Sequence, residues 1–190
     1  MLRTALLSLA LLSAAVPAFA AETYKFDPNH TNIVWRANHF GFSNPDGKFV
    51  GVSGTVTLDE AAPANSKVEV TIPVTSLVTG LPKFDEHLQS ADFLDVAKFP
   101  AATFVSDKVE LTGADTAKVH GTLTLHGVSK PLVLDVKLNK IAPNPMSNIK
   151  TAGFTASTVI KRSDFGISAY VPNVSDDVTI HIEAEANLAS

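Results

Sequence analysis

Apolar and polar residues alternate with a period of two along most of the chain after residue 22. In segment 31–40, TNIVWRANHF, the side chains of Ile33, Trp35 and Ala37 fall on one face of an extended strand, and the residues between them fall on the other. Such alternation is typical of β-strands with one buried face. The same pattern recurs in segments 23–27, 47–59, 66–74, 102–111, 117–127, 130–140, 152–161 and 176–186.

The pattern predicts about eight or nine strands joined mostly by short turns. Short turns indicate antiparallel pairing, because a parallel pair needs a crossover of about a dozen residues. A one-sided sheet of this size closes into a barrel or stacks as a sandwich, and a barrel of about eight strands leaves room for one small ligand. The inward positions hold Val, Leu, Ile, Ala and Gly with almost no charge, so a barrel here has an apolar interior.

One segment, residues 76–100, interrupts the alternation. Pro82 suits the first turn of a helix, Asp85 suits its N-terminal half, and Phe84 and Leu88 share one face. We therefore expect a short helical insertion in an otherwise all-β domain.

The first 20 residues differ from the rest of the chain. One cation, Arg3, precedes an apolar run over residues 5–16, and Ala18-Phe19-Ala20 matches a small-x-small cleavage pattern. Residues 1–20 are therefore expected to be a secretory signal peptide, and residues 21–190 a single exported domain without a membrane-spanning helix. We expect this domain to reside in the periplasm.

Composition narrows the classes of function. The chain has 190 residues, no cysteine and a net charge of −4. A disulfide framework and a thiolate metal site are therefore excluded, and the acidic balance argues against a nucleic-acid partner.

The six histidines do not predict a metal site. His120 and His126 lie six residues apart on the polar side of one strand, about 20 Å along it, so they cannot share an ion and are expected to face solvent. His30, His39 and His87 lie near turns and the expected helix, but their spacing matches no familiar ligand pattern. We expect no metal and no cofactor.

Catalytic residues are equally hard to find. The chain has no Gly-x-Ser-x-Gly turn, and its serines lie in turns or on strand faces. The adjacent acids Asp85-Glu86 and Asp176-Asp177 point in different directions along the backbone and fit a helix N-terminus and a turn. The sequence therefore predicts a protein that is not an enzyme.

Aromatic side chains gather in the connections and not in strand centres. Residues 40–49 hold three Phe, residues 84–99 hold three more, and the loop 161–175 holds Phe165 and Tyr170. Two explanations stay open: a small secondary core beneath long loops, or an apolar mouth at one end of the barrel.

Four separated blocks of the sequence resemble the YceI family: DPNHTNIVWRANHFGFSNPDGKFVGVSGTVTLD, FDEHLQSADFLDVAKFPAATFVS, VHGTLTLHGVSKPLVLDV and FTASTVIKRSDFGISAYVPNVSDDVTIHIEAEA. The resemblance runs from about Tyr24 to Ala186 in the same order. It implies an exported all-β domain with a lipocalin-like antiparallel eight-stranded barrel and a short helical insertion. It also implies that a polyisoprenoid or similar long-chain amphiphile binds inside the barrel.

Under this resemblance, the loop aromatics and their apolar neighbours are expected to line the ligand site, with a few polar residues to anchor a head group. The expected apolar lining is Trp35, Phe40, Phe42, Phe49, Phe84, Leu88, Phe93, Phe165, Ile167 and Tyr170. The expected polar anchors are His39, His87 and Arg162.

The identity of the head group depends on two positions. The family usually carries Arg before its Asp-x-His-Leu unit, whereas Phe84 stands there in this chain, which favours a less anionic or neutral head group. Arg162 either anchors the head group or forms a salt bridge to Asp164 or Asp176 that fixes the loop.

Three functions follow from these alternatives. The first is a periplasmic carrier, monomeric or homodimeric, for an isoprenoid quinone, a prenyl phosphate or a fatty amide. The second is a non-catalytic stress-response interaction protein with a filled barrel. The third is a hydrolase-type enzyme that uses His39, His87 and Asp85.

Overall fold

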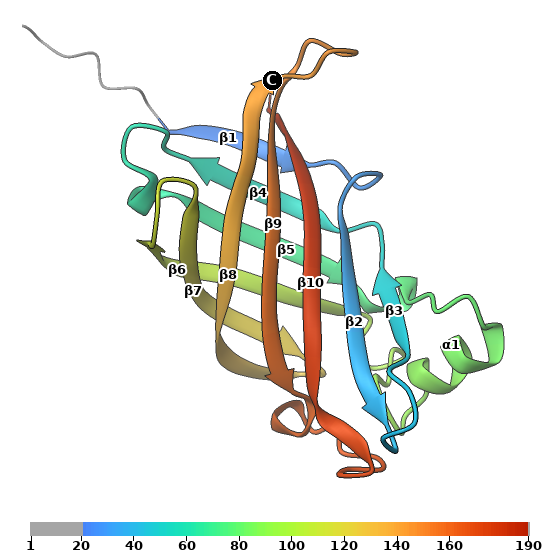
Figure 1. Cartoon of the computed structure of the whole chain (residues 1–190). Coiled ribbons are helices and arrows are strands. Elements are labelled where there is room, and N and C mark those ends of the chain that lie inside the picture. The colour runs from blue at the N-terminus through green and yellow to red at the C-terminus, as the bar shows by residue number, and fades with distance from the viewer. Residues whose placement is uncertain (1–20, 190) are drawn as a thin grey trace, which may run out of the picture.

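Ten β-strands and one short α-helix follow one another along residues 21–189, the part of the chain that this computed structural model describes (Figure 1). The expected signal peptide, residues 1–20, lies outside the described residues. The strands are β1 (Glu22–Phe26), β2 (Asn32–His39), β3 (Asp46–Phe49), β4 (Ser53–Leu58), β5 (Lys67–Pro73), β6 (Ala101–Leu111), β7 (Thr116–Leu125), β8 (Val128–Pro143), β9 (Lys150–Lys161) and β10 (Val174–Leu188). The helix is α1 (Pro82–Gln89), and short 3-10 turns cover Pro63–Asn65, Val74–Ser76 and Arg162–Phe165.

All neighbouring strands are antiparallel, in the order β1-β4-β5-β6-β7-β8-β9-β10-β2-β3. Strand β10 also pairs with β1, which closes eight strands into a barrel. Because β1 pairs with the end of β10 (Tyr24 opposite Leu188) and β2 with its middle (Ile33 opposite Ile182), β1 and β2 act as two halves of one interrupted strand. The predicted eight-stranded antiparallel barrel with a helical insertion is confirmed.

Segment 47–59, expected as one strand, is divided into β3 and β4. Gly51, between them, adopts a positive φ of 66°, a backbone conformation that bends the chain out of the extended form and that glycine adopts without a steric penalty. Buried Val52 follows it. The bend lets β3 pair with β2 and β4 pair with β1.

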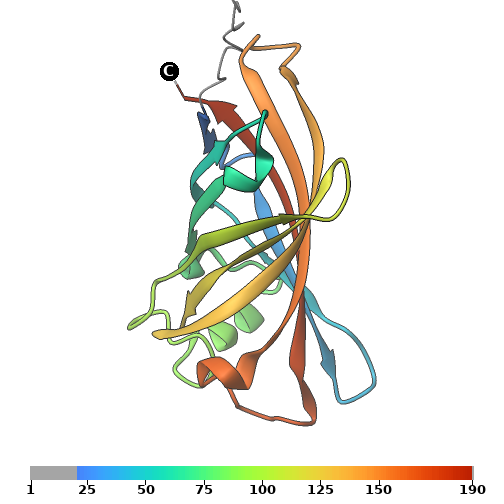
Figure 2. The same ribbon diagram turned by 90° about the vertical axis from the view of Figure 1, so that its left-hand side faces the viewer.

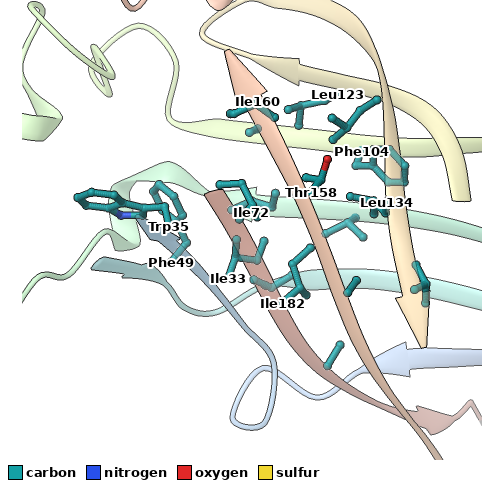
Figure 3. A pocket seen from close by; sticks show the side chains of 18 of the residues that line it. Ile33, Trp35, Phe49, Ile72, Phe104, Leu123, Leu134, Thr158, Ile160 and Ile182 are labelled. Carbon is teal, nitrogen blue, oxygen red and sulfur yellow. The ribbon is translucent and has the colours of Figure 1, made fainter. Parts of the chain in front are cut away.

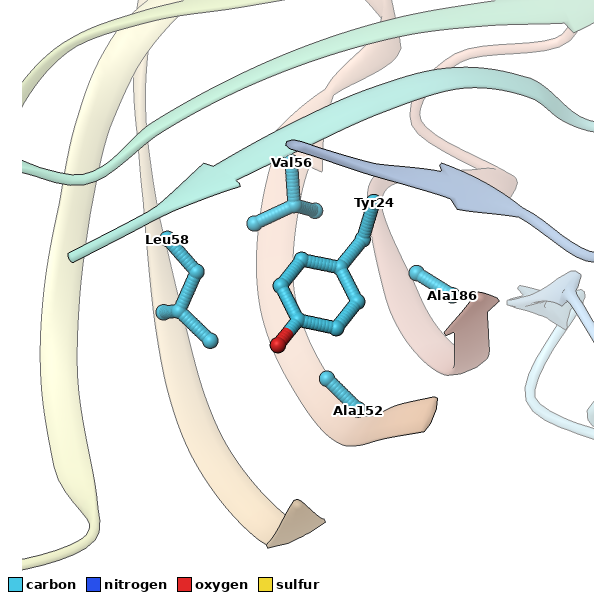
Figure 4. Packing of buried hydrophobic residues seen from close by; sticks show 5 residues of the cluster. All are labelled: Tyr24, Val56, Leu58, Ala152 and Ala186. Atoms are coloured by element: carbon cyan, nitrogen blue, oxygen red, sulfur yellow. The ribbon is translucent and has the colours of Figure 1, made fainter. Parts of the chain in front are cut away.

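A compact apolar cluster lies where the first and last strands meet. Tyr24 on β1 is fully buried among Val56, Leu58, Ala152 and Ala186, as Figure 4 shows. Its burial raises the pKa of the phenol, whose hydroxyl donates a hydrogen bond of 2.9 Å to Glu22 Oε2. The Tyr24 ring therefore contributes packing to the closure of the barrel between β10, β1 and β4.

Helix α1 begins at Pro82, as the sequence predicts, and lies outside the barrel near one of its ends (Figures 1 and 2). Thr79 donates its backbone N–H (2.7 Å) and its hydroxyl (2.6 Å) to Asp85 Oδ1, which fixes the chain entering the helix. None of the helix residues is fully buried.

Three connections meet at the same end of the barrel, the lower end in Figure 1, which we call the aromatic end: residues 40–45, 79–100 and 162–173. Phe40 N–H donates to the carbonyl of Asn173 (2.8 Å), which joins the first connection to the third. The hairpin turn at residues 144–149 lies at the opposite end.

Candidate functional site

The barrel encloses a cavity of about 740 Å³, a volume typical of small-ligand pockets. Inward-facing side chains of nearly every strand line it, including Ile72, Phe104, Leu134 and Ile182, while Thr158 is one of the few polar groups among them (Figure 3). The alternation in each strand creates this lining, because every second side chain points inward. Such a cavity suits an apolar ligand.

Trp35 stands at the boundary between the barrel wall and α1. It lies opposite Gly47 on β3, where an added Cβ would come within 2.7 Å of Trp35 Cζ2, so glycine is needed for the indole to lie against the strand. The ring meets Phe84 edge to face at a centroid distance of 6.5 Å. Its Nε1–H is buried and has no hydrogen-bond partner, which leaves one unused donor beside the cavity.

Most of the residues expected in the apolar lining do border the cavity. These are Trp35, Phe40, Phe49, Phe84, Leu88, Phe93, Ile167 and Tyr170. Their contact with a ligand stays a prediction.

Phe42 and Phe165 do not border the cavity. Phe42 is 91% exposed at the tip of a tight turn, in which His39 N–H donates to Ser43 O and Phe42 N–H donates to His39 O. Phe165 is 3% exposed and packs in an apolar cluster with Phe104 and Leu123. Period-two reasoning does not apply to either residue, because neither lies in a strand.

The two histidines expected to be anchors lie at the rim of the cavity, at the aromatic end. His39 contacts Phe40 edge to face at 4.6 Å between ring centroids, and His87 contacts Phe93 in the same way at 5.0 Å. Both side chains are exposed, so each keeps ring nitrogens available at the cavity mouth.

Arg162 is buried, and its guanidinium is occupied by backbone carbonyls. Nε donates to Ser175 O (2.9 Å), Nη1 to Ile167 O (3.0 Å), and Nη2 to Ala169 O (2.8 Å) and Val174 O (2.9 Å). Burial lowers the pKa of the guanidinium. The ion pairs of residues 21–189 do not include Arg162, so the expected salt bridge to Asp164 or Asp176 is wrong, although Arg162 does fix the loop.

Asp176 stabilises the start of the same loop from outside. Its carboxylate accepts the backbone N–H and the hydroxyl of Ser163, both at 2.8 Å, and these hydrogen bonds lower the pKa of the carboxyl group. Loop 162–173 is thus tied at both of its ends.

His126 does not lie on a solvated strand face as expected. It occupies the turn between β7 and β8 with a positive φ of 52°, and its Nδ1 lies 3.0 Å from the carbonyl oxygen of Phe165. Its ring packs against Phe99 at 4.5 Å. Tertiary contacts with two loops therefore cover this residue.

The residues named for the hydrolase alternative do not form a catalytic unit. Asp85 is engaged by Thr79, and no hydrogen bond within residues 21–189 joins it to His39 or His87. Within that range no group of three or more His, Cys, Asp or Glu side chains is arranged to hold a metal ion.

The residues in the strand centres that line the cavity were not named individually from the sequence. Ala156 and Ile182 border the middle of the cavity and are small or aliphatic. The alternation of each strand places these residues on the inward face and was the signal that could have identified them.

These features define the class of protein: a closed antiparallel barrel of eight strands around an apolar cavity, the architecture of barrels that hold one small ligand. Residues 24–186 match the family model of the YceI-like domain, and the chain belongs to the YceI family. None of the helices in residues 21–189 is long and apolar enough to span a membrane.

Related proteins support this assignment. A UPF0312 protein of Pectobacterium atrosepticum is 43% identical over 190 residues, which cover 97% of each chain. The solved structure of a Campylobacter jejuni YceI protein is 36% identical, with a TM-score of 0.72 over 80% of this chain and 90% of that one. A polyisoprenoid binding domain from Saccharophagus degradans has the same fold at 16% identity, with a TM-score of 0.68 over 87% of this chain and 98% of that one.

Proposed function

We propose that this protein binds a polyisoprenoid or a similar long-chain amphiphile inside its barrel and carries it through the periplasm without catalysing a reaction on it. The observation that carries the proposal is the apolar cavity of about 740 Å³. Each methylene group moved from water into such a cavity gains about 0.8 kcal/mol, so a chain of several isoprene units supplies ample binding free energy. The polyisoprenoid binding domain from Saccharophagus degradans supports this ligand class by its shared fold.

An uncharged head group fits the aromatic end best. Among residues 21–189, Arg162 is the one Lys or Arg side chain that borders the cavity at this end, and it already donates four hydrogen bonds to carbonyls. Phosphate recognition favours guanidinium and ammonium groups with free donors. The ring nitrogens of His39 and His87 and the Trp35 indole N–H offer hydrogen-bonding groups instead, so an isoprenoid quinone or a fatty amide is favoured over a prenyl phosphate.

The structure gives less support to the two alternative functions. A filled barrel was the feature of the interaction-protein alternative, and the barrel contains a cavity. The hydrolase alternative required His39, His87 and Asp85 to converge, and Asp85 is bound to Thr79 instead. The proposed periplasmic location depends on the pattern of residues 1–20.

The test is native mass spectrometry of the protein purified from the periplasm of its own host, followed by extraction and identification of the bound molecule. A stoichiometric isoprenoid or long-chain amphiphile is expected. A mass equal to the bare chain that persists after incubation with an isoprenoid quinone and a polyisoprenol would overturn the proposal.

A matched pair of variants locates the site. Ala156 on β9 faces the cavity between Val136 and Ile182, and Ser157 beside it faces outward. Ala156→Phe should fill part of the cavity and reduce the bound fraction at least tenfold, whereas Ser157→Phe should retain its cargo. Equal cargo in both variants would place the ligand outside the barrel.

A further inference from the structure

Exposed aromatic side chains occur at one end of the barrel. Among residues 21–189, the exposed Phe and Tyr side chains are Phe42 (91%), Tyr170 (57%) and Phe40 (46%), and all three lie in connections at the aromatic end. Leu81, before α1, is 63% exposed at the same end. Isolated exposed apolar residues are ordinary, but aromatic residues gathered around a cavity mouth indicate an interaction surface.

Local backbone preference does not explain two of these aromatic residues. Phe40 and Tyr170 adopt positive φ values of 54° and 61°, a left-handed conformation that costs a bulky residue about 1–2 kcal/mol. Glycine or asparagine would adopt it more easily. Both residues are about half exposed, so burial of the rings offsets only part of this conformational cost. The strained backbone therefore indicates that the aromatic side chains have a function at these positions.

Hydrogen bonds fix the backbone of the loops that carry these side chains. Gly41 N–H donates to Asn38 Oδ1 (2.8 Å), which supports the turn beneath Phe42. Val174 N–H donates to Tyr170 O (2.9 Å), and Phe40 N–H donates to Asn173 O (2.8 Å). The aromatic surface is therefore organised in advance, and a partner does not have to order it.

The aromatic surface is continuous with the cavity. Phe40 and Tyr170 border the cavity and also reach solvent, and Tyr170 lies beside Phe93 with ring centroids 6.1 Å apart. Apolar side chains thus lead from the barrel interior to solvent at Phe40 and Tyr170, and Phe42 follows Phe40 by two residues in the same turn. The proposed cargo is a membrane lipid. Such a cargo can move directly between a bilayer and the cavity when the cavity mouth contacts the bilayer.

Size and charge distinguish between occupants. Four exposed apolar side chains are few compared with the roughly 20–30 residues that each partner supplies to a stable protein interface. The three connections carry five acidic and three basic residues. Asp95 and Arg162 among them are buried, which leaves four acidic and two basic residues that solvent reaches. Two such acidic ends repel each other, and so would an anionic membrane, whereas a zwitterionic bilayer does not.

We infer that the aromatic end docks on the surface of a zwitterionic lipid bilayer, with Phe40, Phe42 and Tyr170 entering the interface so that cargo passes between membrane and cavity. The Phe rings are apolar and enter the boundary between head groups and acyl chains, and the Tyr ring adds a hydroxyl that stays at the level of the head groups. The role of docking in cargo transfer rests on the proposed function, whereas docking itself can be measured independently of any cargo.

The experiment measures binding of the full mature protein to vesicles of phosphatidylcholine and phosphatidylethanolamine. Phe42→Ser removes the most exposed ring, and Phe42 itself does not border the cavity, so cargo stoichiometry should stay unchanged while vesicle binding falls about tenfold. Met146→Ser is the matched control, because Met146 is 96% exposed in the turn at the opposite end. It should bind vesicles like the unchanged protein.

A second pair reports insertion directly. Phe42→Trp should show a blue shift of its fluorescence when these vesicles are added, above the signal of Trp35 in the unchanged protein, and Met146→Trp should show none. Equal vesicle binding of Phe42→Ser and Met146→Ser, or no shift at position 42, would overturn the inference.

Further outcomes separate the inference from the proposed function. Stoichiometric cargo without vesicle binding overturns docking and leaves the carrier function intact, whereas Phe42-dependent vesicle binding without any cargo supports docking and overturns the carrier function. Binding that occurs only with vesicles containing phosphatidylglycerol and is unaffected by Phe42→Ser would indicate an electrostatic contact. That result would overturn the docking inference. Sedimentation that shows a dimer lost in Phe42→Ser would assign the surface to a second copy.

Discussion

Arg162 stabilises loop 162–173 through carbonyl oxygens, and no acidic side chain in the described part of the chain forms an ion pair with it. Its planar guanidinium presents several donors in fixed directions, which suits four carbonyls that converge from Ile167, Ala169, Val174 and Ser175. The carbonyl dipoles replace the water that burial removes. The side chain thereby connects the beginning of the loop to its end.

Replacing Arg162 by methionine should destabilise the protein strongly. Arg162→Met leaves four carbonyls without their donor, and we expect the free energy of unfolding to fall by about 3 kcal/mol. Urea unfolding measures the loss, and hydrogen exchange should show faster exchange over residues 163–175.

The neighbouring Lys161 provides the control. Its exposed ion pair with Asp177 (2.8 Å) is accessible to solvent, so Lys161→Met should cost less than about 1 kcal/mol. If Arg162→Met folds as stably as Lys161→Met and loses only cargo, Arg162 is a ligand anchor and not a structural residue.

At the scale of the element, the segment around α1 is attached to the barrel at its two ends. Lys48 and Val78 exchange two backbone hydrogen bonds of 2.9 Å before it, and Val74 N–H donates to Pro100 O (2.8 Å) after it. Every backbone-to-backbone hydrogen bond that the described residues 79–99 donate is accepted by a carbonyl within the same segment. Phe84, Leu88 and Phe93 hold it over the mouth by apolar contact alone, so it is the part of the rim that opens most easily.

Removing the Asp85 carboxylate should loosen this segment. Asp85→Ala eliminates both hydrogen bonds from Thr79, which should lower the free energy of local opening by about 1 kcal/mol, and cargo should dissociate roughly fivefold faster. Global unfolding should change little, because α1 contains no fully buried residue. Stopped-flow release of a fluorescent isoprenoid analogue measures the rate.

Glu86→Ala is the comparison for this variant, since the adjacent Glu86 is exposed and its side chain forms no hydrogen bond within residues 21–189. It should release cargo at the unchanged rate. Identical release from both variants would show that the α1 segment does not control access to the cavity.

At the scale of the whole molecule, closure joins residues near the two ends of the chain. Tyr24, Lys25 and Phe26 pair with Leu188, Asn187 and Ala186. Without this pairing the barrel would have two exposed strand edges, and the cavity would open along its side.

Ending the chain after Glu183 should therefore open the barrel. We expect a loss of at least about 3 kcal/mol in the free energy of unfolding, a large part of the stability of a domain of this size, together with loss of cargo and aggregation through the free edges. Ending the chain after Leu188 removes one described hydrogen bond, Ala189 N–H to Thr23 O, and should cost about 1 kcal/mol. Equal midpoints of urea unfolding for the two truncations would contradict the role assigned to closure.

The local pattern was enough to predict much of this structure. Val119, Leu123, Leu134 and Ile182 face inward as their alternation predicts, and the helix begins at Pro82. Both results follow from interactions between residues close in sequence, since the strand period and the fixed φ of proline are local properties.

Other outcomes needed contacts between distant residues. Phe42 and Phe165 have similar local sequences, each beside a glycine, yet one is exposed at a loop tip and the other is buried beneath β7. The acids near Arg162 made a salt bridge plausible, but the fold of the loop brought carbonyls to the guanidinium instead.

The sequence by itself therefore determined the antiparallel strands, their apolar inner face and the position of the helix, because alternation and helix-start signals act over a few residues. The alternation left barrel and sandwich open, and the pairing of β1 with β10 decided for the barrel. Tertiary structure alone decided which aromatic side chains border the cavity, which ones project from the mouth, and how Tyr24 meets Ala186. Those outcomes depend on how loops and chain ends pack after the sheet has closed, and no short stretch of sequence contains that information.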